Sequence, residues 1–133
     1  MRNMDEMLPQ PLVLGHHLIL EFCGCPYERL THVEDVHNAM HEAALAGNCS
    51  IVGDYYHQFK PHGASGATVI EESHLTVHTW PEHGYAAVDF FYCGGNVDSE
   101  AVIEVLKHRF EPTDVSVTEL TRGPLAPHAA LPA

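Results

Sequence analysis

The residues that could do chemistry gather between Thr68 and His83, where the chain reads TVIEESHLTVHTWPEH. Two adjacent carboxylates, Glu71 and Glu72, run directly into Ser73, and three histidines follow within the next ten residues. Such a set could form a metal site or a hydrolase nucleophile with its base. It could also be the polar side of a solvated strand.

The local pattern argues against the first two of these chemistries. A hydrolase serine normally lies in a G-x-S-x-G turn, and Ser73 has no such glycines around it. His74 and His78 would share a face on a helix, but the β-branched residues and Pro81 favour a strand, in which residues four apart are about 13 Å distant. The metal set that this stretch could offer is His74, His78 and His83, and an extended strand does not bring these three together. We therefore expect no metal site.

Strand alternation makes the segment unusual. A strand over residues 68–78 would place Glu71 and Ser73 on one face and Glu72 and His78 on the other, so neither face is cleanly apolar. Polar residues in the middle of a strand contradict simple patterning, and such contradictions tend to mark functional sites. A strand with its polar groups facing water remains the alternative at this point.

Composition sets limits on the class of protein. The 133 residues suit one domain, and 45% hydrophobic with 18% charged residues is a globular composition. Six basic against 18 acidic residues give a net charge of -12, which opposes nucleic-acid binding. We find no apolar run that could cross a membrane and no apolar core of a secretion signal, so we expect no membrane association and a cytoplasmic location. The four cysteines are then expected to be thiols.

Periodicity and turn residues predict a β-α-β-β-β-α-β order. We expect strands over residues 12–22, 49–59, 68–78, 85–93 and 114–120. We expect helices over residues 31–48 and 98–110. Thr31 and Glu34 would form a capping box for the first helix, and Asp98 would cap the second. This order predicts an α+β fold, a two-layer α/β sandwich whose antiparallel or mixed sheet carries two helices on one face. The domain should span residues 11–122, with flexible ends at 1–10 and 123–133. The uncovered face of the sheet favours a homodimer.

The stretch SGATVIEESHLTVHTWPEHGYAAVDFFYCG, residues 65–94, resembles the core signature of the prokaryotic S-adenosylmethionine decarboxylases, the small pyruvoyl-dependent type. The likeness extends to LGHHLILEF at residues 14–22 and to the helix after Cys93, and so covers most of residues 14–120. It implies self-cleavage between Glu72 and Ser73 into a β chain of residues 1–72 and an α chain of residues 73–133. The serine hydroxyl attacks the preceding carbonyl to form an ester, elimination releases the upstream chain, and Ser73 becomes a covalent pyruvoyl group.

The resemblance also implies roles for two further residues. The pyruvoyl group forms a Schiff base with the substrate amine and accepts the electrons left by the departing carboxylate, which makes the protein a carboxy-lyase. Cys93 is then the catalytic proton donor, and His78 is the proton acceptor in processing. On an extended strand His78 would lie about 16 Å from Ser73 and on the opposite face. Either the chain bends sharply at Glu72-Ser73, or His78 acts in another way.

The substrate implied is S-adenosylmethionine, whose decarboxylated product supplies aminopropyl groups for spermidine synthesis. Phe59, Trp80 and Glu82 match a nucleoside pocket, and Ser65 is expected to shape the precursor loop. Glu71 stands where we expect a small hydroxyl residue, and its carboxylate could pair with a cationic side chain, so ornithine and arginine are alternative substrates. An unprocessed, non-catalytic binding or regulatory homologue is the alternative from another class of protein.

Overall fold

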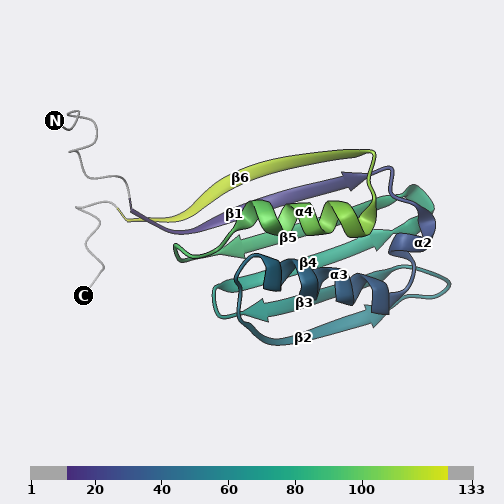
Figure 1. Cartoon of the computed structure of the whole chain (residues 1–133), viewed down its shortest axis with the longest axis horizontal. Helices are drawn as coiled ribbons and strands as arrows, with labels where there is room; N and C mark the ends of the chain where they lie inside the picture. The colour runs from purple at the N-terminus through teal and green to yellow at the C-terminus, as the bar shows by residue number, and fades with distance from the viewer. Residues whose placement is uncertain (1–11, 126–133) are drawn as a thin grey trace.

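The computed structural model describes residues 12–125, which form one antiparallel sheet with helices on one of its faces (Figure 1). The elements in chain order are β1 (Leu12–Cys23), α2 (Tyr27–Leu30), α3 (Val33–Ala46), β2 (Ile51–Gln58), β3 (Ala64–Ile70), β4 (Ser73–Trp80), the 3-10 turn η1 (Pro81–His83), β5 (Tyr85–Tyr92), α4 (Ser99–Phe110) and β6 (Asp114–Leu125). The six strands lie in the order β2-β3-β4-β5-β1-β6. The α+β two-layer architecture predicted from the sequence is confirmed.

The sheet has one strand more than predicted, because the segment from 68 to 78 is not continuous. β3 ends at Ile70, Glu71 and Glu72 form a turn, and β4 begins at Ser73. The loop expected after residue 59 is also shorter, since β3 already begins at Ala64. β3 and β4 are therefore the two arms of a tight hairpin.

The two long helices begin differently. α4 has the predicted N-cap, because the Asp98 carboxylate accepts a hydrogen bond of 3.1 Å from the N–H of Ala101. α3 begins at Val33, whose N–H donates to Oε1 of Gln58 at 2.7 Å and not to Thr31, so the predicted capping box of Thr31 and Glu34 is wrong. Thr31 is buried there, where its hydroxyl does not reach the helix end, and the four-residue helix α2 before it was not predicted.

The core lies between the sheet and the helices. Phe22 of β1 and Phe110 of α4 are both fully buried, and their rings meet edge to face with centroids 5.7 Å apart. Along β4 the side chains of Leu75 and Val77 are buried, whereas His78 and Trp80 are exposed. Since strand side chains alternate, these exposed residues lie on the opposite face. Within residues 12–125 no helix covers that face (Figure 1).

The ends of the domain differ slightly from the prediction. β6 continues to Leu125, so the first three residues of the predicted flexible tail 123–133 belong to a strand, whereas residues 1–10 and 126–133 lie outside the described residues. No helix in the described part of the chain has the length and hydropathy needed to span a membrane. Cys23, Cys25, Cys49 and Cys93 are all free, which confirms the prediction of thiols.

The substitution Phe110→Ala should lower the free energy of unfolding by about 3–5 kcal/mol, because it removes a buried ring and leaves a cavity against Phe22. The matched control is Leu45→Ala on α3, whose side chain is 63% exposed, and it should change the free energy by less than about 0.5 kcal/mol. Chemical denaturation followed by circular dichroism measures both, in a Ser73→Ala background that keeps one uncut chain. Equal losses from the two substitutions would contradict this core.

Candidate functional site

A two-residue turn, Glu71-Glu72, lies at the centre of the candidate site. Ile70 pairs with Ser73 across this turn. Two-residue hairpin connections favour residues that adopt positive φ, such as glycine or asparagine, and this turn has neither. The positive φ falls instead on Ser73, at 145°. A non-glycine residue in such a conformation costs roughly 1–3 kcal/mol, so Ser73 carries local backbone strain.

Backbone groups from two other segments hold the turn in place. The carbonyl of Ser50 accepts a hydrogen bond of 2.8 Å from the N–H of Glu71, and the N–H of Ser50 donates to the carboxylate of Glu72 at 3.0 Å. From the other side, the N–H of Cys93 donates to the carbonyl oxygen of Glu72 at 2.8 Å. The peptide bond between residues 72 and 73 is thus fixed, with its carbonyl already polarised by a donor.

Cys93 is an exposed thiol beside Ser73 in the fold. It follows Tyr92, which pairs with Ser73 across β4 and β5, and it is exposed. Cys25 and Cys49 are buried, and burial raises the pKa of each thiol to about 11. Cys23 is exposed but lies at the opposite end of the sheet. The structure therefore brings together Ser73, Glu72 and Cys93, three of the residues singled out from the sequence.

The structure has the sharp bend at Glu72-Ser73 that was one of the two alternatives, but it contradicts the expectation that Glu71 and Ser73 share a strand face. The chain does bend there, but Glu71 lies exposed in the turn and does not share a strand face with Ser73, because β3 has ended at Ile70. The bend does not bring His78 closer either. β4 is extended from Ser73 onwards, which leaves His78 about 16 Å along the strand.

A second group of predicted residues lies at the other end of β4. Ser65 of β3 is directly opposite His78, and its hydroxyl is 2.7 Å from His78 Nδ1. These two residues belong to a hollow of about 380 Å³. Its lining consists of Phe59, His62, Ser65, His78, Thr79, Trp80 and Glu82. The hollow thus contains all three residues assigned to a nucleoside pocket, together with the predicted processing pair.

The hollow offers open aromatic faces and a carboxylate. Phe59 is 47% and Trp80 42% exposed, so their rings are accessible to a flat ligand. The carboxylate of Glu82 lies 2.7 Å from Nε2 of His62, and this hydrogen bond holds the pKa of Glu82 below its usual range. His62 in turn contacts the hydroxyl of Tyr27 through Nδ1, at 2.9 Å. The pocket therefore presents an ionised carboxylate held in a fixed position.

His62 and Tyr27 were not singled out from the sequence. His62 lies in the Gly/Pro-rich segment between β2 and β3, and Tyr27 opens the short helix α2. Neither residue belongs to a pattern that indicates a ligand. Only the packing of these two connections against η1, which carries Glu82, brings them to the hollow.

The two groups of site residues are far apart within one chain. Ser73 and Trp80 are the first and last residues of β4 and are separated by about 23 Å of extended strand. The Glu71-Glu72 turn and Cys93 lie at one end, and the hollow lies at the other. One protomer alone does not place the hollow beside Ser73.

Comparison with known proteins gives one consistent result. The sequence profile described as S-adenosylmethionine decarboxylase matches residues 16–123. Over 110 residues the chain is 46% identical to the S-adenosylmethionine decarboxylase proenzyme of Acidithiobacillus ferrooxidans, covering 83% of each chain. It is 47% identical over 110 residues to that of Thermosipho melanesiensis, covering 83% of this chain and 85% of the relative. The crystal structure of the adenosylmethionine decarboxylase from Aquifex aeolicus superposes with a TM-score of 0.81 at 28% identity, covering 90% of this chain and 98% of the other.

The substitution His62→Ala should raise the pKa of Glu82 towards the usual glutamate value, because the hydrogen bond that favours the ionised carboxylate is lost. A carbon-detected NMR titration of the side-chain carboxyl measures the shift. His108→Ala, which removes an exposed histidine from α4, is the control and should leave the pKa of Glu82 unchanged. An unaltered titration of Glu82 in His62→Ala would show that this contact does not form.

Proposed function

The chain belongs to the S-adenosylmethionine decarboxylase family, and from that membership we propose that it cuts its own backbone before Ser73 and uses the resulting pyruvoyl group to remove carbon dioxide from S-adenosylmethionine. The relatives compared above are named proenzymes, as a self-processing decarboxylase requires. The product would supply aminopropyl groups for polyamine synthesis. The observation that carries the proposal is the strained Ser73 next to a carbonyl that already accepts a hydrogen bond.

The scissile turn supplies two aids to cleavage. Ser73 Oγ attacks the carbonyl carbon of Glu72, the C–N bond breaks as a C–O bond forms, and the hydroxyl proton ends on the nitrogen. Negative charge develops on the Glu72 oxygen during this attack, where the N–H of Cys93 is in place to stabilise it. Rearrangement also releases the strain at Ser73. Loss of the Cα proton then expels the Glu72 carboxylate from Cβ, and hydrolysis leaves a ketone at residue 73 and ammonia.

The residues around position 73 fit a pyruvoyl group at that place. The residue after the cut begins β4 and is paired with Tyr92, so the new chain end has a fixed position. The group supplies an electron-withdrawing carbonyl, which accepts the electron pair left by the departing carboxylate. The exposed thiol of Cys93 is the nearby acid that returns a proton to the substrate Cα.

The remainder of the substrate suits the hollow at the other end of β4. The faces of Phe59 and Trp80 would hold adenine, and the carboxylate of Glu82 would accept hydrogen bonds from the ribose hydroxyls. A basic amino acid such as ornithine or arginine would offer this hollow only one cationic group, whereas a nucleoside offers both a flat ring system for Phe59 and Trp80 and hydroxyls for Glu82. Glu71 alone suggested such a substrate, and it lies outside the hollow.

A homodimer would bring the two halves of the site together. In a two-fold dimer that pairs the uncovered sheet faces, with the axis running across the strands, β4 of one protomer runs antiparallel to β4 of its partner. The Ser73 end of each strand then faces the partner's hollow. The same arrangement places a His78 near each scissile turn, which the extended strand of a single protomer does not allow. We therefore propose that each complete site is formed by residues of two protomers.

Intact-mass analysis should find two chains in the purified wild-type protein, cut between Glu72 and Ser73, and one full-length chain in Ser73→Ala, because alanine has no hydroxyl to attack the carbonyl. Hydrazine should label residue 73 in the wild type and not in Ser73→Ala. Ser50→Ala is the matched control, since the hydrogen bonds of Ser50 described above use its backbone, and this variant should still be cut. An uncut wild type without a reactive ketone would indicate the non-catalytic homologue instead.

Coproduction of two inactive chains tests the shared site. His78→Ala should remain uncut alone, because its processing histidine is missing, but should be cut when produced with Ser73→Ala, whose His78 is intact. With random pairing, half of the dimers are mixed and each has one complete site, so about a quarter of the wild-type activity should return. The assay is release of labelled carbon dioxide from S-adenosylmethionine.

These experiments test the shared site, the role of His78 and the substrate separately. If the mixture stays uncut and inactive, the site is not shared between protomers, whereas the family assignment is unaffected. If His78→Ala is cut when alone, His78 is not the processing residue. Release of carbon dioxide from ornithine or arginine, and none from S-adenosylmethionine, would contradict the assignment of S-adenosylmethionine as the substrate.

A further inference from the structure

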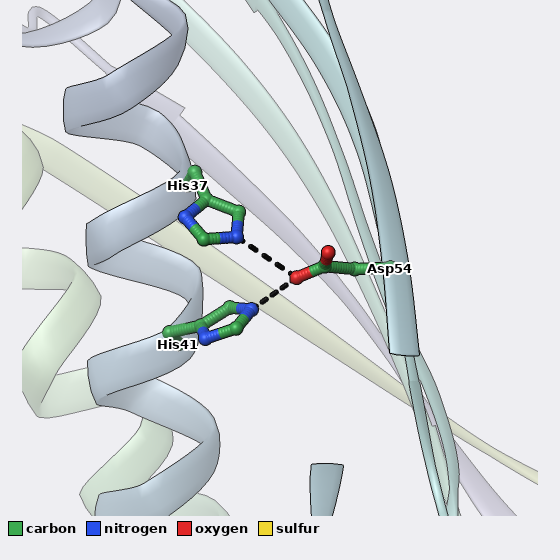
Figure 2. Close-up of side chains that lie close together, drawn as sticks. All are labelled: His37, His41 and Asp54. Atoms are coloured by element: carbon green, nitrogen blue, oxygen red, sulfur yellow. Dashed lines mark hydrogen bonds and ion pairs between the residues drawn. The ribbon is translucent and has the colours of Figure 1, made fainter. Parts of the chain in front are cut away.

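Three side chains outside both groups of site residues converge on one point. His37 and His41 project from α3 towards Asp54 on β2 (Figure 2). Nε2 of His37 is 2.9 Å from Oδ2 of Asp54, and Nε2 of His41 contacts the same oxygen. The three donor atoms lie within 4.8 Å of one another. Among residues 12–125, this is the one group of three or more His, Cys, Asp or Glu side chains with donor atoms so close together.

The spacing along the chain explains the convergence. His37 and His41 are four residues apart on a helix, which places both rings on one face, with centroids 4.0 Å apart. Two histidines at this helical spacing are a known zinc-binding arrangement. Asp54 comes from the edge strand of the sheet, which passes directly under that face of α3. The donors therefore come from two separate elements, as in metal sites that join parts of a fold.

The neighbouring side chains orient the donors. The ring of Tyr56 packs edge to face against His37 at 4.8 Å, and its own hydroxyl is fixed by Thr68 at 2.7 Å. Partial burial opposes ionisation of Asp54, but the hydrogen bonds from His41 and His37 prevail and lower the pKa of this carboxyl. Asp54 is therefore a carboxylate at neutral pH and can act as a ligand.

The pattern of contacts fits a cation better than simple hydrogen bonds. Both imidazoles approach the same carboxylate oxygen, although a carboxylate has two oxygens that could each accept one donor. Two charged imidazoles 4.0 Å apart would repel each other. Two neutral imidazoles and one carboxylate leave a net charge of about -1 for a divalent cation to neutralise.

We propose that His37, His41 and Asp54 bind one zinc-class divalent cation, which joins α3 to the edge strand β2. Two imidazole nitrogens and a carboxylate oxygen are ligands that zinc prefers, and tetrahedral coordination sets such ligand atoms about 3.3 Å apart. Small side-chain rotations from the observed 2.9 Å contact are enough to admit the ion. An adjacent hollow of about 320 Å³, lined by His37 and Tyr56 among others, leaves room for a water molecule as fourth ligand.

The test uses the full chain without an affinity tag, freed of metal by a chelator. Equilibrium dialysis with zinc alone should give one bound ion per chain in the wild type. Asp54→Asn and His41→Gln should weaken that binding by more than roughly 100-fold, because even outer-shell partners contribute 10- to 100-fold. Zinc near saturation should raise the melting temperature of the wild type by roughly 5 °C and leave both variants unchanged.

Controls assign the ion to this cluster. His108→Gln, which removes an exposed histidine from α4, should bind zinc as the wild type does. Ser73→Ala should also bind equally, so the result does not depend on self-processing. Nitrogen-detected NMR should show Nε2 of His37 and His41 shifting on zinc addition. Absence of a bound ion, or binding that survives Asp54→Asn and is lost in Cys93→Ala, would overturn the proposal and leave the cluster as a hydrogen-bonded contact.

Discussion

One backbone hydrogen bond, from the N–H of Cys93 to the carbonyl of Glu72, determines how the reactive turn is placed. It joins the end of β5 to the hairpin of β3 and β4, so the strained residue after Glu72 cannot relax by moving away from the sheet. It also sets the Cys93 thiol beside the position of the future chain end. The strained Ser73, the polarised carbonyl and the exposed thiol are therefore brought together by one register between neighbouring strands.

One face of the sheet packs against the helices, and the other carries exposed residues of the candidate site. Alternation along the strands sends one set of side chains into a core of aromatic and aliphatic residues under α3 and α4. The other set, which includes His78 and Trp80, is left for binding. The length of β4 separates the Glu71-Glu72 turn from the hollow, which is the reason for proposing that each complete site lies between two copies of the chain.

The sequence was sufficient for the α+β class and for the two long helices, but not for the division of residues 68–78 between two strands or for the short helix α2. Apolar periodicity located the two long helices, and the family resemblance singled out Ser73, Cys93 and five of the seven residues that line the hollow, but not His62. The turn at Glu71-Glu72 was not predicted, because neither residue has the turn preference of glycine, proline or asparagine. The capping box failed because Thr31 is buried in a connection whose path depends on the tertiary fold.

His37 and His41 of α3 also show that local sequence pattern does not reveal contacts between elements. Their spacing of four residues within a predicted helix was visible in the sequence, and it was the signal that could have drawn attention to them. Their partner Asp54 belongs to a strand that only the packing of α3 on β2 brings near. Local pattern therefore indicates which residues share a face of one element, whereas the contacts between elements need the fold.

The strand order has a consequence for the proposed cut before Ser73. Severing the chain before Ser73 leaves β1, β2 and β3 on the upstream piece and β4, β5 and β6 on the downstream piece. In the sheet, however, β1 lies between β5 and β6, and β3 pairs with β4. The two pieces are interleaved, so neither can depart without dismantling the sheet. The proposed break would thus create a new chain terminus while both fragments stay held in one sheet.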